Sequence, residues 1–220
     1  MGNSMNQQEG VIKYRLEHHY RALPSHIHVD QINAWRAVFF RLKLIGQTPE
    51  RYQGLGYGNI SQRLQPGESR FLISGTQTAH LDFLSPDHFS CVEWASPKDN
   101  VIRSSGPCKP SSEALTHASV YRHSLNTQAV IHVHCPEIWR NTHQLQLPHT
   151  NADIAYGTLE MTEAVEHLFA SKQFEKTPIF SMLGHEDGVV AFGDTLTNAA
   201  VTLLKQFVNA MAIEQRNGAS

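Results

Sequence analysis

The sequence predicts a single α/β domain in which helices cover a mixed or largely antiparallel sheet. Short apolar runs alternate with turn sequences along the middle of the chain, and amphipathic helical patterns precede and follow them. The 220 residues suit one large domain better than two, and the 40% share of hydrophobic residues is enough for a packed core.

Residues 1–29 are polar, and we interpret them as an N-terminal arm with about one turn of helix, ahead of a domain over residues 30–220. The first clear helix is expected from Asp30, which can cap it, to about Ile45. Apolar residues recur there at helical spacing, and Gly46 ends the pattern.

Short apolar runs bounded by turn residues predict the strands. We expect strands at Asn59–Leu64, Arg70–Ser74, Phe89–Trp94, Val101–Ser104, Ala129–His134, Ile179–Leu183 and Gly188–Phe192. Further helices are expected from Ser112 to about His123, from Pro136, over Thr158–Ala170, and after Asp194.

Two histidines lie two residues apart on the predicted strand Ala129–His134. Alternate residues of a strand point to the same face, so His132 and His134 can converge on one metal ion. Ile131 and Val133 would then face the core on the other side. With 14 histidines in the chain, about one such triplet is expected by chance, so the motif is weak alone.

His185 and Glu113 are candidate partners of this histidine pair. His185 lies between two predicted strands, but Asp187-Gly188 is a good hairpin turn, so a simple turn residue is the alternative. Glu113 follows Ser111 and Ser112 at a predicted helix start, where the helix dipole alone would favour a carboxylate. The same helix start, with its hydroxyls and exposed N–H groups, could also bind a substrate anion.

We interpret most of the remaining histidines as surface or packing residues. The triplet His26-Ile27-His28 lies in the polar arm without a strand pattern, so we assign it no function. His117 follows Glu113 by one helical turn and is a candidate to support the site from behind the metal ligands.

Four motifs, taken in order, resemble the class II aldolase/adducin family. They are Gly58-Asn59-Ile60-Ser61, Ser111-Ser112-Glu113, His132-Val133-His134, and His185 ahead of a strand and the final helix. The resemblance extends over residues 30–212. It implies a three-layer α/β/α fold with a central mixed, mostly antiparallel sheet, and enzymes that form homotetramers with active sites at subunit interfaces.

The resemblance also implies a role for each matching residue. The metal, usually zinc with manganese, iron or cobalt as alternatives, would be bound by His132, His134 and His185. The catalytic acid/base would be Glu113. A substrate phosphate would be held by Gly58, Asn59, Ser111 and Ser112, with a looser match at Ser74 and Thr76.

The implied activity is that of a metal-dependent lyase. It would cleave a small sugar or hydroxy-carbonyl compound, with or without a phosphate, by a retro-aldol reaction through a metal-stabilised enolate. A sugar-phosphate dehydratase or epimerase on the same fold is one alternative, and a non-catalytic adducin-like assembly domain is another.

The chain departs from the family pattern in two places. Glu186 and Asp187 stand between His185 and Gly188, either as turn residues or as additional acids of the site. The stretch from His134 to Tyr156 is shorter than in the family's aldolases, so their catalytic tyrosines have no counterpart that we can assign.

Charge and composition exclude several other classes. The formal net charge of −2 argues against a nucleic-acid surface, and no apolar run reaches the length of about 18 residues that a membrane span needs. The three cysteines form no CxxC pair, which suits a reducing cytoplasm. We therefore expect a cytoplasmic homo-oligomer that binds a small-molecule substrate and neither nucleic acid nor membrane.

Overall fold

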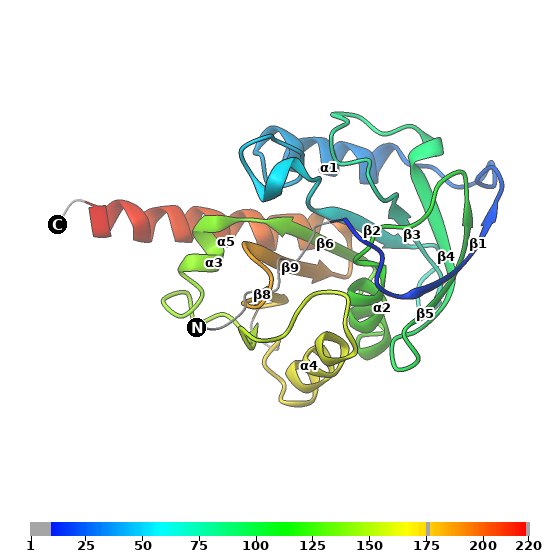
Figure 1. Ribbon diagram of the computed structural model, residues 1–220. Helices are drawn as coiled ribbons and strands as arrows, with labels where there is room; N and C mark the ends of the chain where they lie inside the picture. Colours follow the sequence, from blue (N-terminus) through cyan, green and yellow to red (C-terminus); the bar gives the residue numbers. More distant parts are fainter. Residues whose placement is uncertain (1–9, 175–176, 219–220) are drawn as a thin grey trace.

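The computed structural model describes residues 10–174 and 177–218, and these form a central sheet with helices around it (Figure 1). The sheet has nine strands in the order β1-β5-β4-β3-β2-β6-β9-β8-β7. They are β1 (Arg15–Tyr20), β2 (Asn59–Arg63), β3 (Phe71–Ser74), β4 (Phe89–Ser96), β5 (Val101–Gly106), β6 (Ala129–His134), β7 (His149–Thr150), β8 (Ile179–Met182) and β9 (Gly188–Gly193).

The helices are α1 (Asp30–Arg41), α2 (Ala114–His123), α3 (Pro136–Arg140), α4 (Leu159–Ala170) and α5 (Leu196–Gly218). Two short 3-10 turns lie at Tyr52–Gly54 and Pro86–His88. The predicted mixed α/β fold, with a central sheet and helices, is confirmed.

Strand pairing differs between the edges and the centre of the sheet. The two edge strands, β1 and β7, pair in parallel with β5 and β8. The pairings between them are antiparallel. In the centre, this register places Asn59 of β2 opposite His132 of β6, and Gly188 of β9 opposite His134.

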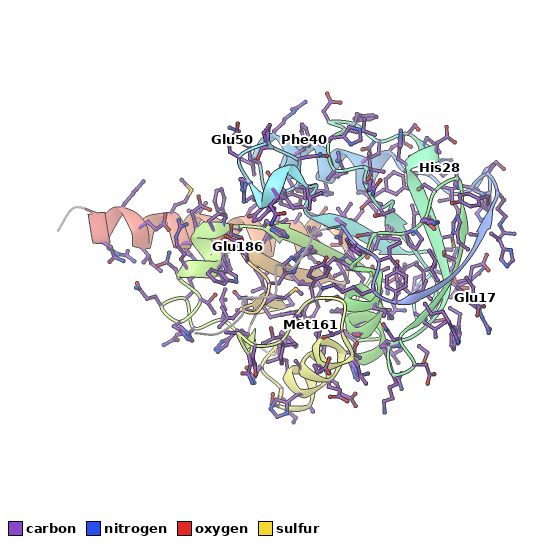
Figure 2. All side chains as sticks on the ribbon, in the orientation of Figure 1. Glu17, His28, Phe40, Glu50, Met161 and Glu186 are labelled. Carbon is purple, nitrogen blue, oxygen red and sulfur yellow. The ribbon has the colours of Figure 1, made fainter. Side chains whose placement is uncertain are left out.

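Side chains alternate between two apolar cores on opposite faces of the sheet. Ile131 and Val133 of β6 belong to the core that includes residues of α1 and α5, as the alternation predicts. Val130 belongs to the other core, with residues of α2 and of α4, where Met161 is buried (Figure 2). Figure 1 shows α1 and α4 on opposite sides of the sheet, with α5 projecting beyond it. The face that carries Val130 also carries His132 and His134.

The N-terminal arm differs from its prediction. Arg15–Tyr20 is a strand instead of a helical turn, and it pairs with β5 at the sheet edge. Its polar sequence conceals the strand because most of its residues are exposed at this edge. Residues 1–9 lie outside the described part, and the domain division at residue 30 stays a prediction.

The start of one helix differs from its prediction, whereas the final helix begins after Asp194 as expected. The helix α2 begins at Ala114, so Glu113 and not Ser112 occupies the position before its first turn. The helix α5 begins at Leu196, where the Thr195 hydroxyl accepts the Asn198 N–H at 3.0 Å. Within the described residues, there is no helix with the length and apolar character needed to span a membrane.

Candidate metal centre

Three histidines from separate parts of the sequence meet at the centre of the sheet. His132 and His134 come from β6, and His185 comes from the turn between β8 and β9. Each offers a ring nitrogen, and these atoms all lie within 4.8 Å of one another. All three side chains are buried, with at most 1% of their surface exposed. The group therefore has the spacing and donor chemistry of a site that could hold a divalent ion.

Two glycines leave room for the close packing of the turn that carries His185. A Cβ on Gly184 would overlap the carbonyl of Ile154. A Cβ on Gly188 would lie 3.1 Å from the His185 ring. Asp187 also has a left-handed backbone, with φ of 60°. The local sequence thus favours both a tight turn and a buried imidazole. His185 can therefore be a turn residue and a member of the histidine group at the same time.

Glu113 lies between the histidines and the start of α2. Its Oε1 is 3.3 Å from Nδ1 of His185 and 3.6 Å from Nε2 of His132. Its Oε2 accepts a hydrogen bond from the Thr116 hydroxyl at 3.3 Å. Burial raises the pKa of the Glu113 carboxyl, and His185 and Thr116 offset part of this effect. A carboxyl with a raised pKa is suited to both accepting and donating a proton near neutral pH.

The surroundings of His132 and His134 favour neutral imidazoles. Nδ1 of His132 lies 3.2 Å from the Val189 carbonyl. A carbonyl only accepts, so this contact places the proton on Nδ1 and leaves Nε2 as the nitrogen that could bind an ion. Burial holds the pKa of His134 well below its usual value, with His185 and His132 adding to the effect. Neutral, buried imidazoles fit zinc and related divalent ions.

A small cavity of about 30 Å³ opens beside Glu113 and His132, both of which line it. The predicted substrate-binding residues that also line it are Gly58, Asn59, Thr76, Ser111 and Ser112. Ser74 is not among the described residues of its wall. The Ser74 hydroxyl instead accepts the Ile60 N–H at 3.2 Å, which indicates a structural role.

Gly58 has a second reason to be glycine. Its φ is +76°, and a Cβ there would lie 2.8 Å from Cγ1 of Ile45 and 3.1 Å from the His132 carbonyl. The glycine therefore allows the chain to pass close to β6 just before Asn59 enters β2. This packing alone accounts for the glycine, with or without a substrate.

Two tyrosines that the sequence did not assign to the site pack against the histidines. The Tyr52 ring meets the edge of His134 with centroids 4.5 Å apart, and the Tyr156 ring stacks on His185 at 4.6 Å. Tyr156 begins Tyr156-Gly157-Thr158, a segment that also resembles the family pattern, and this resemblance was a signal for it. Tyr52 lies in a loop without periodicity, so no pattern indicated it.

The N-terminal segment also reaches the site. Nζ of Lys13 lies 3.7 Å above the Tyr156 ring and donates to the Tyr156 carbonyl at 3.0 Å. The Tyr14 hydroxyl donates to the Ser111 carbonyl at 2.8 Å, and Gly10 lines the cavity. The polar sequence of this segment predicts an arm and gives no sign of these contacts.

His117 lies in the same buried region. Its Nδ1 is 2.7 Å from the Ser61 hydroxyl. Burial and the neighbouring His132 hold its pKa well below the usual range, so it is neutral. Its supporting role at the metal site stays a prediction. In the described part of the chain, His26 and His28 belong to no group of side chains that could hold a metal ion.

Comparison with known proteins assigns the family. The sequence profile of the Class II Aldolase and Adducin N-terminal domain matches residues 49–213. The chain belongs to the class II aldolase and adducin family. No curated protein sequence matches it.

Solved structures of the class II aldolase and adducin family share the fold. The L-fuculose-1-phosphate aldolase of Thermus thermophilus superimposes with a TM-score of 0.57 and 19% identity, covering 86% of this chain and 94% of that one. A sugar-phosphate aldolase of Thermotoga maritima gives 0.64 and 14% over the same shares. YgbL of Klebsiella pneumoniae, a candidate aldolase/epimerase/decarboxylase, gives 0.60 and 18%, covering 84% and 87%.

The residues matched by the family model do not include every segment that contacts the site. All the predicted site residues fall within residues 49–213, whereas β1 and Lys13 precede this range. The contacts of the N-terminal segment with the site are therefore an addition to the matched region.

Proposed function

We propose that the protein is a metal-dependent lyase of the class II aldolase type. It would cleave a small hydroxy-carbonyl compound, such as a sugar or sugar phosphate, by a retro-aldol reaction. The observation that carries this proposal is the position of Glu113, buried beside two of the three histidines and on the wall of a polar cavity. A carboxyl group in that position has access both to the metal site and to a bound substrate.

The proposed ligands of the ion are His132, His134 and His185, with zinc the first choice and manganese, iron or cobalt as alternatives. When bound, the ion would supply Lewis-acid polarisation of a substrate carbonyl and its neighbouring hydroxyl, worth several kcal/mol in the transition state. The three histidines and Glu113 are buried, with at most 3% of their surface exposed.

Glu113 would be the catalytic acid/base. Cleavage of the carbon–carbon bond turns the hydroxyl-bearing carbon into an aldehyde, so that hydroxyl group loses a proton, which would leave to solvent. The carbon next to the carbonyl must gain a proton, and the Glu113 carboxyl would deliver it. In the reverse direction, the carboxylate would remove the same proton. The raised pKa keeps a fraction of the group protonated at a higher pH than an exposed glutamate.

The other end of the substrate would occupy the polar cavity. Asn59, Ser111 and Ser112 contribute amide and hydroxyl groups there, and the start of α2 lies beside them. Such neutral donors and a helix N-terminus suit a phosphate or a polyhydroxylated chain. Thr76, which also lines the cavity, would add a further hydroxyl, whereas Ser74 would support β2.

Dehydration or epimerisation stays an alternative on the same residues, because both reactions use the same proton transfer next to a carbonyl. The adducin-like assembly function needs neither the ion nor Glu113. The three-layer, mostly antiparallel description of the fold and the homotetramer also belong to this proposal, supported by the two cores, the central pairings and the family.

The proposal is tested with Glu113→Gln. We expect this variant to keep its metal and to lose about 10²–10⁴-fold in turnover, because only the proton transfer is removed. Elemental analysis measures the metal, and a panel of sugar phosphates and free hydroxy-carbonyl compounds is assayed for aldehyde release. Release of water without cleavage would identify a dehydratase.

The matched control is Glu186→Gln, on the turn that carries His185. Glu186 is exposed (Figure 2), so its loss should leave turnover unchanged. Wild-type turnover in Glu113→Gln on an identified substrate would refute the acid/base role. A large loss of turnover in Glu186→Gln would instead assign the proton transfer to Glu186.

A further inference from the structure

Three polar residues join two loops beside His134. The Tyr52 hydroxyl donates to Oδ2 of Asp187 at 2.6 Å and accepts from Nη2 of Arg51 at 2.6 Å. Arg51 and Asp187 also form an ion pair at 3.8 Å. Tyr52 and Arg51 belong to the loop before β2, whereas Asp187 belongs to the turn that carries His185.

This cluster contacts the proposed metal ligands from outside. The Tyr52 ring covers the edge of His134, and Nη2 of Arg51 reaches the His134 carbonyl at 3.4 Å. The Asp187 carbonyl accepts the N–H of Cys135, the residue after His134, at 2.8 Å. Asp187 thus connects the end of β6 to the His185 turn, and Tyr52 fixes Asp187 from the other side.

The backbone at the cluster is held in an unfavourable conformation. Tyr52 and Asp187 have φ of 49° and 60°, in the left-handed region that residues other than glycine rarely adopt. Such residues persist where their surroundings determine them, and here the side-chain bonds between the two loops do so. Arg51 further donates to the Lys43 carbonyl at 2.9 Å, which ties the loop to the end of α1.

We infer that Arg51, Tyr52 and Asp187 form a clamp that holds His134 and His185 at metal-binding spacing and slows the loss of the ion. The inference rests on the proposed metal site. In the family pattern, glycine directly follows the third histidine, whereas Asp187 is one of two residues inserted here. The clamp would give Asp187 a role in supporting the ligands in addition to forming the turn. Of the described residues that line the cavity, Tyr57 is one and Tyr52 is not. We therefore expect the clamp to act on the ion and not on the substrate.

The test is the rate at which zinc leaves the zinc-loaded protein when a colorimetric chelator is added in excess. Tyr52→Phe removes only the hydroxyl, and Asp187→Asn removes only the charge. We expect each to release zinc about 10-fold faster or more, as is typical when a group that supports a metal ligand is lost. Because the three residues act as one unit, the double variant should be little faster than the faster single variant.

The matched controls are Tyr20→Phe and Asp99→Asn. Tyr20 is 68% exposed on β1, and Asp99 accepts a hydrogen bond from Ser96 in the β4–β5 turn, so both should release zinc at the wild-type rate. Zinc release unchanged in Tyr52→Phe and Asp187→Asn would overturn the clamp but leave the metal site intact. Wild-type protein that takes up no zinc would overturn the proposed function and the clamp with it.

Discussion

The strand β6 carries His134, and the loop before β2 packs against the same histidine, but the two segments are held in place by different interactions. All six residues of β6 are buried, and the strand is paired on both sides in regular antiparallel ladders. The loop contains consecutive left-handed residues, Tyr52 and Gln53, and depends on side-chain bonds to Asp187. Two of the three proposed ligands, His132 and His134, thus come from a regular strand, whereas the support of His134 comes from an irregular loop held by a few polar contacts.

The two regions should therefore differ in how they respond to mutation. Stability in β6 comes from apolar burial on both faces of the sheet, which is distributed over many contacts. The loop buries little apolar surface, and the left-handed conformation costs about 1–2 kcal/mol per residue. Changes in β6 should unfold the protein, whereas changes in the loop should alter the metal centre before they alter the fold.

The largest effect should come from Ile131→Ala in β6. Ile131 is fully buried in the core that includes residues of α1 and α5, so its truncation leaves a cavity. We expect the free energy of unfolding to fall by about 2–5 kcal/mol, measured by denaturant unfolding of the apo protein. Val208→Ala, at a 63% exposed position of α5, should change it by less than about 0.5 kcal/mol. Equal losses of unfolding free energy in the two variants would show that burial in β6 contributes no more to stability than an exposed position.

A small effect of opposite sign should come from Gln53→Gly in the loop. Gln53 is exposed and has φ of 60°, so glycine relieves the left-handed cost but adds entropy to the unfolded chain. The net gain in unfolding free energy should be about 0.5–1 kcal/mol. The exposed Gln65, which is not in the left-handed region, is the control, and Gln65→Gly should lower stability instead. A loss in Gln53→Gly would show that the loop conformation is not strained.

The sequence predicted the part of the site that lies on regular elements. Periodicity located β6, and the two-residue spacing then placed His132 and His134 on one face. Glu113 and His185 required the order of motifs in the family, because each also had a local explanation in the helix dipole or the hairpin turn. The predicted residues of the polar cavity also came from the family motifs. Ser74 is the exception, because its hydroxyl accepts a hydrogen bond from the backbone of β2 and it is not among the lining residues.

Contacts that depend on irregular backbone or on an edge strand were not predictable. Tyr52 reaches His134 only because a left-handed turn of non-glycine residues directs it there, and turn preferences do not favour that conformation. β1 lacks a clear alternation because it is an exposed edge, so Lys13 and Tyr14 were assigned to an arm. In both cases, contacts with residues far away in the sequence determine where the segment lies.

The central claim is tested most directly by the metal content of the purified protein. Elemental mass spectrometry on tag-free wild type and on His132→Ala gives the number of ions per chain. The account predicts about one divalent ion per wild-type chain and its loss in His132→Ala. Wild type without metal that also binds no added zinc would contradict the account and favour the assembly domain over the lyase.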